Sequence, residues 1–294
     1  MNTKTVKWIV VLGVVFMSTS AIFGRMVTTP AVLTAMYRML FSALLLLPAV
    51  LRGHRKELLH IKRRNLLMCL LCGVVLGIHF TAYMESVQYT HIASSTVLVD
   101  TEVLFVAAML LVFFHEKIPR AGLIGIALAM VGSVVIALGD TGGGSNILYG
   151  DLMAILGAIC SSAYTLIGRS QRRYLSTTVY TFLVYASAAV TLFAAAVATG
   201  QTFTGYAISD FGYILCMAVF CTLLGHSIFS WGLKYVSAAF ISMAKLGEPV
   251  GATIMAIFLF GELPQLNQVV GGAIVIAGIA AYLFAKENAA ARQS

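Results

Sequence analysis

Eight ionisable side chains lie inside long apolar stretches of this sequence, where a charge is costly and needs a partner or a role. In chain order they are Arg25, Arg38, His79, Asp100, Glu102, His226, Lys245 and Glu248. Side chains of these types can bind the charged groups of a small ligand or exchange protons with it. Whether they do so depends on which helices carry these side chains and which faces of those helices they occupy.

Lys245 and Glu248 are three residues apart and therefore share one face of a helix. In one interpretation they neutralise each other. In the other they bind the carboxylate and the amine of a substrate, or Glu248 exchanges a proton. Both interpretations stay open at this level.

The composition indicates a membrane protein. Of its 294 residues 60% are hydrophobic and only 10% are charged, too few charges to cover the surface of a soluble domain of that length. Apolar runs of about 20 residues, the length that crosses a bilayer, recur along nearly the whole chain. The lipid bilayer is therefore expected as its surroundings, with no room for a soluble domain.

The apolar runs predict an all-α protein with ten transmembrane helices. We expect them at residues 8–27, 31–51, 65–84, 92–114, 121–139, 148–168, 178–199, 210–232, 238–260 and 267–285. Lys and Arg concentrate in alternate loops, and the opposite loops carry none, which places both termini in the cytoplasm of a cell whose plasma or inner membrane holds the chain. The net charge of +8 thus reflects topology and gives no reason to expect nucleic acid as a partner.

The two halves of the sequence resemble each other. Thr101-Glu102-Val103 matches Gly247-Glu248-Pro249, a shift of 146 residues (248 minus 102), and the surrounding residues keep that register. Five helices in each half is an odd number, so the second half must be inverted, as in many secondary transporters. We expect one repeat at 1–140, a connecting loop at 141–147 and a second repeat at 148–294.

Asp100 and Glu102 point about 200° apart on a helix and cannot both face one cavity. Because the repeat aligns Glu102 with Glu248, Glu102 is expected to face a central cavity. Asp100 is expected to pair with Arg38 or another basic group between helices.

Two histidines lie at nearly equivalent places in the two repeats, and aromatic residues surround them. His79 with Tyr83, and His226 with Trp231, are candidates to line a cavity for an amphipathic ligand, and histidine can couple to protons. Polar packing between helices is the competing interpretation. No other cofactor is expected, and proton coupling rests only on the presence of titratable groups.

Pro249 removes a backbone donor and predicts a bend in the helix at 238–260. The first repeat has Val103 at that place, so no bend is expected at 92–114. Gly247 and Gly251 form a small face for close helix contact, as do the glycine pairs at 125 and 132 and at 271 and 278.

The chain resembles the EamA-like branch of the drug/metabolite transporter superfamily. Arg38 in the second helix, Leu246-Gly247-Glu248-Pro249-Val250, Phe260-Gly261-Glu262 and Gly271-Gly272 carry the resemblance. It implies ten helices with cytoplasmic termini, a central cavity, and transport of amino acids, other metabolites, drugs or nucleotide sugars. A small-molecule substrate is the expected partner, and a homodimer stays open.

Several enzyme signatures are missing from the sequence. No phosphate-binding Gly-x-x-x-x-Gly-Lys-Ser/Thr loop occurs, and Pro119 takes the place of the second histidine of a zinc-protease motif that begins at His115. We therefore expect a carrier, with no metal site and no catalytic residue, that exports small metabolites, amino acids first, by alternating access. A lipid-linked sugar flippase of the same superfamily and an intramembrane enzyme remain the alternatives.

Overall fold

The computed structural model describes residues 2–90, 92–116, 118–137, 146–261 and 264–291, and all regular structure in these residues is helical. In chain order the elements are α1 Thr3–Met26, α2 Ala31–Gly53, α3 Arg55–Leu59, α4 Arg63–Tyr89, α5 Ile92–Asp100, α6 Glu102–Phe114, α7 Arg120–Ala137, α8 Ile147–Gln171, α9 Thr177–Ala198, α10 Ile208–Cys216, the π-helical segment η1 Met217–His226, α11 Ser227–Gly232, α12 Ala238–Lys245, α13 Glu248–Phe260 and α14 Leu266–Ala291. The short α3 and the π-helical η1 were not predicted. The predicted connection at 141–147 lies mostly outside the described residues.

The helices have the length and surface of a multi-pass membrane protein. Eight helical stretches of the described residues are long and apolar enough to cross a bilayer, and α7 and α14 contribute shorter apolar ones. Large apolar side chains point outward, with Phe113 71% and Phe258 83% exposed. Such a surface requires lipid around it.

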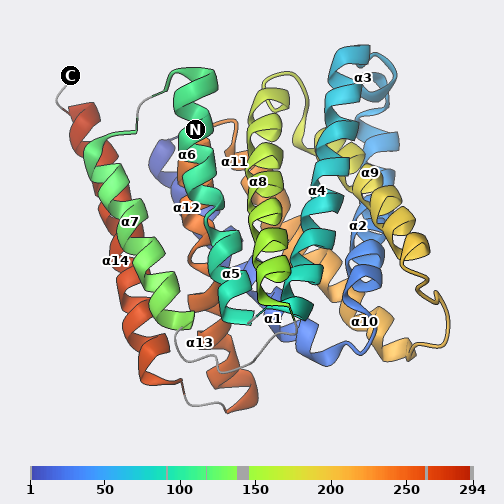
Figure 1. The fold of residues 1–294 in the computed structure, drawn as a ribbon. Coiled ribbons are helices and arrows are strands. Elements are labelled where there is room, and N and C mark those ends of the chain that lie inside the picture. Colours follow the sequence, from blue (N-terminus) through green and yellow to red (C-terminus); the bar gives the residue numbers. More distant parts are fainter. Residues whose placement is uncertain (1, 91, 117, 138–145, 262–263, 292–294) are drawn as a thin grey trace.

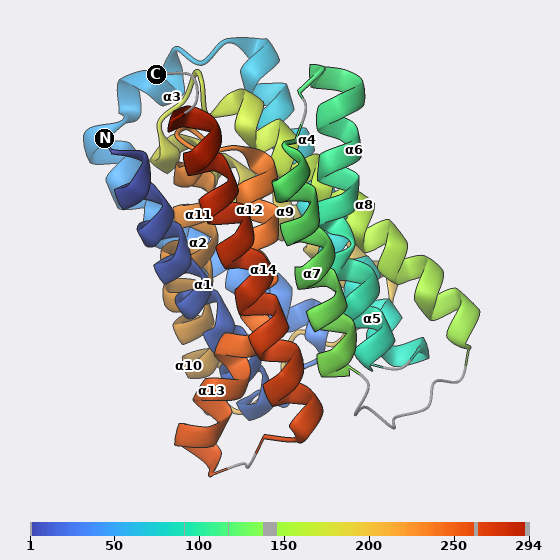
Figure 2. The same cartoon turned by 90° about the vertical axis from the view of Figure 1, so that its left-hand side faces the viewer.

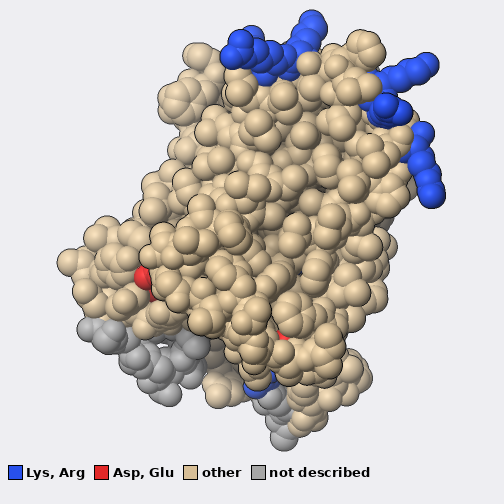
Figure 3. Space-filling view, turned by 90° about the vertical axis from the view of Figure 1, so that its right-hand side faces the viewer, with Lys and Arg blue, Asp and Glu red and all other residues tan. Residues whose placement is uncertain are grey.

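On the face drawn in Figure 3, exposed basic side chains lie mainly at one end of the molecule. In Figure 3 the flank is almost uncharged, and most of the visible Lys and Arg side chains gather at the top. Figures 1 and 2 show that α3, the start of α1 and the end of α14 lie at this same end.

The two halves of the chain are interleaved. α1 packs against η1 and α13, α4 packs against α8 and α9, and α2 packs against α9. At one edge of the molecule α7 lies along α14 (Figure 1). Both hydrophobic clusters therefore combine residues from both halves.

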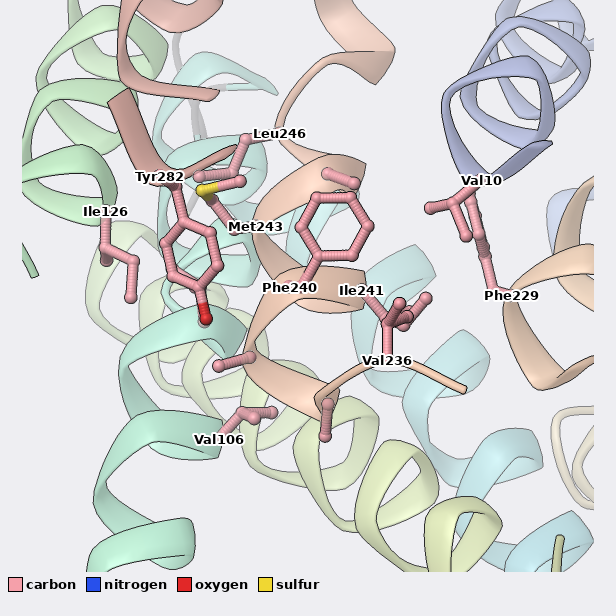
Figure 4. Packing of buried hydrophobic residues seen from close by; sticks show 14 of the residues in the cluster. Val10, Val106, Ile126, Phe229, Val236, Phe240, Ile241, Met243, Leu246 and Tyr282 are labelled. Carbon is pink, nitrogen blue, oxygen red and sulfur yellow. The ribbon is translucent and has the colours of Figure 1, made fainter. Parts of the chain in front are cut away.

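One of these clusters joins the α7–α14 edge to α12. In Figure 4 Tyr282 of α14 lies between Ile126 of α7 and Phe240 of α12. The rings of Tyr282 and Phe240 are 6.1 Å apart, within the usual range for an aromatic pair. The contact ties the edge helices to the helix that carries Lys245.

Glycines allow α7 and α14 to approach closely. A Cβ atom on Gly132 would lie 2.7 Å from the carbonyl oxygen of Gly271, and one on Gly271 would lie 2.7 Å from that of Gly132. Gly125 and Gly278 have the same relation, at 2.8 and 2.7 Å. The packing interpretation of these glycines is confirmed.

Two of the helices are broken, at equivalent places in the two halves. α5 and α6 meet at Thr101, and residues 246–247 separate α12 from α13. Pro249 in the first turn of α13 cannot donate to the carbonyl of Lys245, which explains the second break. The earlier helix, expected without a bend, is also interrupted at Thr101, whose Oγ1 donates to the carbonyl of Leu98 at 2.5 Å.

The half-helices that follow these breaks correspond closely. α6 begins at Glu102 and α13 at Glu248, and each has 13 residues. α6 is followed by His115 at φ 53° and α13 by Gly261 at φ 66°, both in the left-handed conformation that ends many helices. The sequence repeat is therefore also a repeat of element boundaries.

Candidate functional site

Glu102 and Lys245 form a buried ion pair inside the helix bundle. Lys245 Nζ lies 2.9 Å from Glu102 Oε1 and 3.2 Å from Oε2, with side chains 11% and 10% exposed. Hydroxyl groups of Ser161, Thr165 and Ser242 also donate to this carboxylate, at 2.5, 3.1 and 3.0 Å. Glu102 thus joins α6 to α8 and α12 and has no exposed face.

The pairing of Lys245 with Glu248, left open by the sequence, is not what the structure contains. Lys245 ends α12 and Glu248 begins α13, so the two residues do not share one continuous helix. The Lys245 side chain instead reaches Glu102 across the bundle. An ammonium at a helix C-terminus and a carboxylate at a helix N-terminus both lie where the helix dipole favours them.

Arg38 of α2 is buried among neutral groups. It is 5% exposed, its Nε donates to Thr222 Oγ1 at 2.7 Å, and its Nη1 donates to Ser20 Oγ at 3.3 Å. The guanidinium carbon also lies 5.7 Å from the centre of the Phe80 ring. Nη2 is buried and has no hydrogen-bond partner among the described residues.

The predicted pair of Asp100 with Arg38 was wrong. Asp100 Oδ2 accepts a hydrogen bond from Ser133 Oγ of α7 at 2.8 Å. Asp100 ends α5, whereas the Arg38 guanidinium is directed to α1 and η1 by Ser20 and Thr222. Asp100 therefore anchors the broken helix to α7.

Glu248 is the half-buried carboxylate at the start of α13. No hydrogen bond or ion pair joins its side chain to another residue of the described segments. Its charge interacts with those of Asp100, Arg38 and Lys245, so these four residues lie in one electrostatic neighbourhood. Its backbone carbonyl accepts from Ser18 Oγ of α1 at 3.0 Å, which fixes the break against α1.

The rings of His79 and His226 both lie next to the ring of Phe80. The ring of Phe80 lies 5.2 Å from that of His79 and 6.5 Å from that of His226. His79 Nδ1 lies 2.9 Å from the carbonyl oxygen of Gly157 in α8, so this contact is a polar link between helices. Tyr83, one turn further along α4, shares a hydrogen bond with Thr96 of α5.

The remaining candidates have local contacts. Trp231 in α11 lies beside Tyr235, which follows the helix, with ring centres 5.0 Å apart and ring planes tilted by 51°. A Cβ atom on Gly247 would lie 3.2 Å from Val14 of α1, and one on Gly251 would collide with the hydroxyl of Ser18. Both glycines thus lie where α13 and the preceding break approach α1.

A separate cavity of about 200 Å³ opens between α1 and α13, at the end of α1 away from the termini. Arg25 and Gln268 contribute polar groups to a lining that is otherwise mostly of small and apolar residues. Arg25 also lies 5.3 Å from the ring of Phe260. At the other end, Arg169 pairs with Glu116 at 2.5 Å and links α8 to the segment after α6.

The hydroxyl groups around the buried charges were missed by the sequence analysis. Ser161 and Thr165 are four residues apart on α8 and therefore share a face, and Ser242 lies three residues before Lys245. These spacings could have identified them. Thr222 could not have been found, because it lies in a π-helical segment whose register an α-helical pattern does not describe.

No three His, Cys, Asp or Glu side chains of the described residues gather closely enough to hold a metal ion. What the interior offers is one satisfied ion pair together with a cation, Arg38, and a carboxylate, Glu248, that keep unused hydrogen-bonding capacity. Such an arrangement can bind a polar ligand.

Comparisons with known proteins agree with this architecture. An uncharacterized transporter of Clostridium kluyveri is 26% identical over 92% of this chain and 90% of its own length. An uncharacterized transporter of Archaeoglobus fulgidus is 23% identical over 92% and 93%, and the Bacillus subtilis uncharacterized transporter YyaM is 26% identical over 74% and 73%. A crystal structure with 17% identity superimposes with a TM-score of 0.82 over 97% of this chain and 98% of its own, and so has the same fold. The model of the EamA-like transporter family matches twice, at residues 5–138 and 148–284. The chain belongs to the EamA-like transporter family.

Proposed function

We propose that this transporter is a secondary carrier that exports small metabolites, amino acids first, by alternating access. The observation that carries the proposal is the pair of broken helices, whose second parts begin at Glu102 and Glu248. Secondary transporters form their substrate sites with discontinuous helices near the middle of the bilayer. Here the breaks place two carboxylates and Lys245 in the interior of the bundle.

The proposal includes ten membrane-spanning helices with both termini in the cytoplasm. The eight stretches of spanning length, together with the shorter apolar helices in α7 and α14, support this number. The gathering of basic side chains at the end where α1 starts and α14 ends supports the orientation (Figure 3).

It also includes two repeats of opposite orientation, 1–140 and 148–294. The double match of the family model and the corresponding boundaries of α6 and α13 support the repeat. In Figures 1 and 2, α5 and α6 run toward the end that holds α3, whereas α12 and α13 run away from it. Opposite directions are expected if the second half is inverted.

Transport is tested in proteoliposomes that contain the purified chain and no ATP. Vesicles loaded with an unlabelled compound should accumulate its labelled form by exchange when the compound is a substrate. The compounds should include amino acids, polyamines, nucleosides and lipid-linked sugars. Exchange of one class, lost in Glu248→Gln, supports the carrier. No exchange of any compound by protein that is folded and inserted contradicts it.

Direction and orientation need a second experiment in cells. Arg64→Cys and Thr204→Cys place thiols in exposed positions at opposite ends of the bundle. Only the second should react with an impermeant maleimide from outside. Cells that overexpress the chain should release the substrate faster than cells that express Glu248→Gln.

A further inference from the structure

Arg38 is a buried cation without an ion-pair partner among the described residues. Its neighbours, the hydroxyl groups of Thr222 and Ser20 and the ring of Phe80, are all neutral. A guanidinium removed from water is costly unless its charge is compensated. Since Nη2 has no acceptor among the described residues, Arg38 keeps a donor that an anionic ligand could use.

The free part of the guanidinium can form more than one hydrogen bond. Nε is held at 2.7 Å by Thr222, whereas the bond from Nη1 to Ser20 is long, at 3.3 Å. Nη2 and an Nη1 released from Ser20 would present two donors in one plane. This is the geometry in which arginine binds a carboxylate through both oxygen atoms.

Two features hold the guanidinium in this position. Thr222 belongs to η1, and π-helical segments of this kind occur frequently at functional sites. The Phe80 ring covers one face of the guanidinium, so the donors are restricted to the remaining edge.

The other buried charges identify the opposite end of the site. Lys245 is already bound to Glu102, and Asp100 accepts from Ser133. Glu248 is half-buried and has no hydrogen-bond partner for its side chain in the described segments. Its backbone carbonyl accepts from Ser18 of α1, two residues from the Ser20 that contacts Arg38, so both residues lie against the same part of α1. One cation and one carboxylate are thus left for a ligand that carries both charges.

We propose that Arg38 binds the carboxylate of the transported substrate through Nη2 and Nη1, while Glu248 receives its ammonium group. This inference rests on the proposed function and assigns the carboxylate to Arg38, where the sequence had suggested Lys245. The substrate class is then a zwitterion with a free carboxylate and a free amine.

The test compares matched ligands on the purified full chain in nanodiscs. Thermal stabilisation is titrated with each of the common L-amino acids, and then with the amide and the deamino analogue of the tightest binder. Loss of a charge-assisted hydrogen bond should weaken binding of the amide about tenfold to a hundredfold. An amide that binds as tightly as its acid overturns the inference, as does the absence of stabilisation by any amino acid.

The role of Arg38 is tested by combining ligand and variant. In Arg38→Gln the acid should bind as weakly as the amide, and the amide should lose little more, because both changes remove the same interaction. Arg38→Lys keeps a cation but not the planar fork, and is expected to bind the acid with intermediate affinity. Arg173→Gln, in an exposed arginine of the loop after α8, is the matched control and should bind as the unchanged chain does. If folded Arg38→Gln still binds the acid more tightly than the amide by the same factor as the unchanged chain, the assignment of the carboxylate to Arg38 is wrong.

The outcomes separate this inference from the proposed function. The proteoliposomes could exchange a compound that lacks a carboxylate, with no effect of Arg38→Gln. This result would support the proposed carrier function but overturn the carboxylate site at Arg38. The absence of exchange with every compound would instead contradict the proposed carrier function itself.

Discussion

Removal of the Lys245 ammonium should destabilise this protein more than removal of the whole Lys245–Glu102 pair. Lys245→Met leaves the Glu102 carboxylate, only 10% exposed, without its cation. Loss of one partner of a buried pair costs about 3–5 kcal/mol. Three hydroxyl donors remain on Glu102, each worth about 1 kcal/mol, so we expect a loss near the lower limit, about 3 kcal/mol.

The double variant Glu102→Gln with Lys245→Met should lose only about 1 kcal/mol, because replacement of both partners of a buried pair is often nearly neutral. The glutamine keeps an oxygen that can accept from Ser161, Thr165 or Ser242. The single variant Glu102→Gln should be intermediate, since Lys245 still interacts with Asp100 and Glu248. With a loss of about 2 kcal/mol for this single variant, the coupling between the two positions should be about 4 kcal/mol in magnitude.

The free energy of unfolding can be measured by titration with SDS in mixed micelles, followed by the fluorescence of the chain's 2 tryptophans. Lys234→Met removes an exposed lysine next to α11 and is the control for loss of a positive charge. Equal destabilisation by Lys245→Met and by the double variant would refute the reasoning. It would mean that the Glu102 carboxylate is stable without Lys245.

Four further changes have expected outcomes by the same titration or by transport. Gly132→Ala forces a methyl group to within 2.7 Å of a backbone oxygen of α14 and should cost about 1–3 kcal/mol, whereas Gly24→Ala, which meets nothing within 4 Å, should cost much less. His115→Gly should stabilise the chain by up to about 1 kcal/mol because it relieves a positive φ. The opposite change, Gly261→Ala, should destabilise by about 1 kcal/mol through strain alone, since it too meets nothing within 4 Å. Glu248→Gln should leave the free energy of unfolding nearly unchanged while substrate exchange is lost, and a large loss of stability with normal exchange would contradict the role given to this residue.

Much of the fold follows from the sequence because apolar length and glycine spacing act locally. Runs of apolar residues predicted most helix boundaries to within a few residues. The largest differences are at the start of α1, which begins at Thr3 rather than 8, and at the ends of α4 and α14, which are Tyr89 rather than 84 and Ala291 rather than 285. The glycines of α7 and α14 were recognised because a seven-residue spacing keeps them on one face. Such features depend on neighbours along the chain, which the sequence contains.

The break in the earlier helix and the partners of the charges could not be predicted in the same way. The break lies at Thr101, and threonine occurs in many unbroken helices, so the residue type did not indicate the place. Lys245 is three residues from Glu248 and 143 from Glu102, yet it pairs with the distant residue. The break after α12 separates Lys245 from Glu248, so the pair expected from their three-residue spacing does not form.

The two repeats place glutamates at equivalent helix starts but do not give them equivalent surroundings. Lys245 corresponds to Val99 at the 146-residue shift (245 minus 146), so only one repeat supplies a lysine. That lysine binds Glu102 of the other repeat, which leaves Glu248 with its carboxylate unused. Equivalent helix starts thus have different surroundings: Glu102 holds helices together, and Glu248 is the one that we propose binds a ligand. In the proposed alternating-access mechanism, in which inverted repeats exchange conformations, this difference would keep the proposed binding group in one repeat while the Lys245–Glu102 contact spans both.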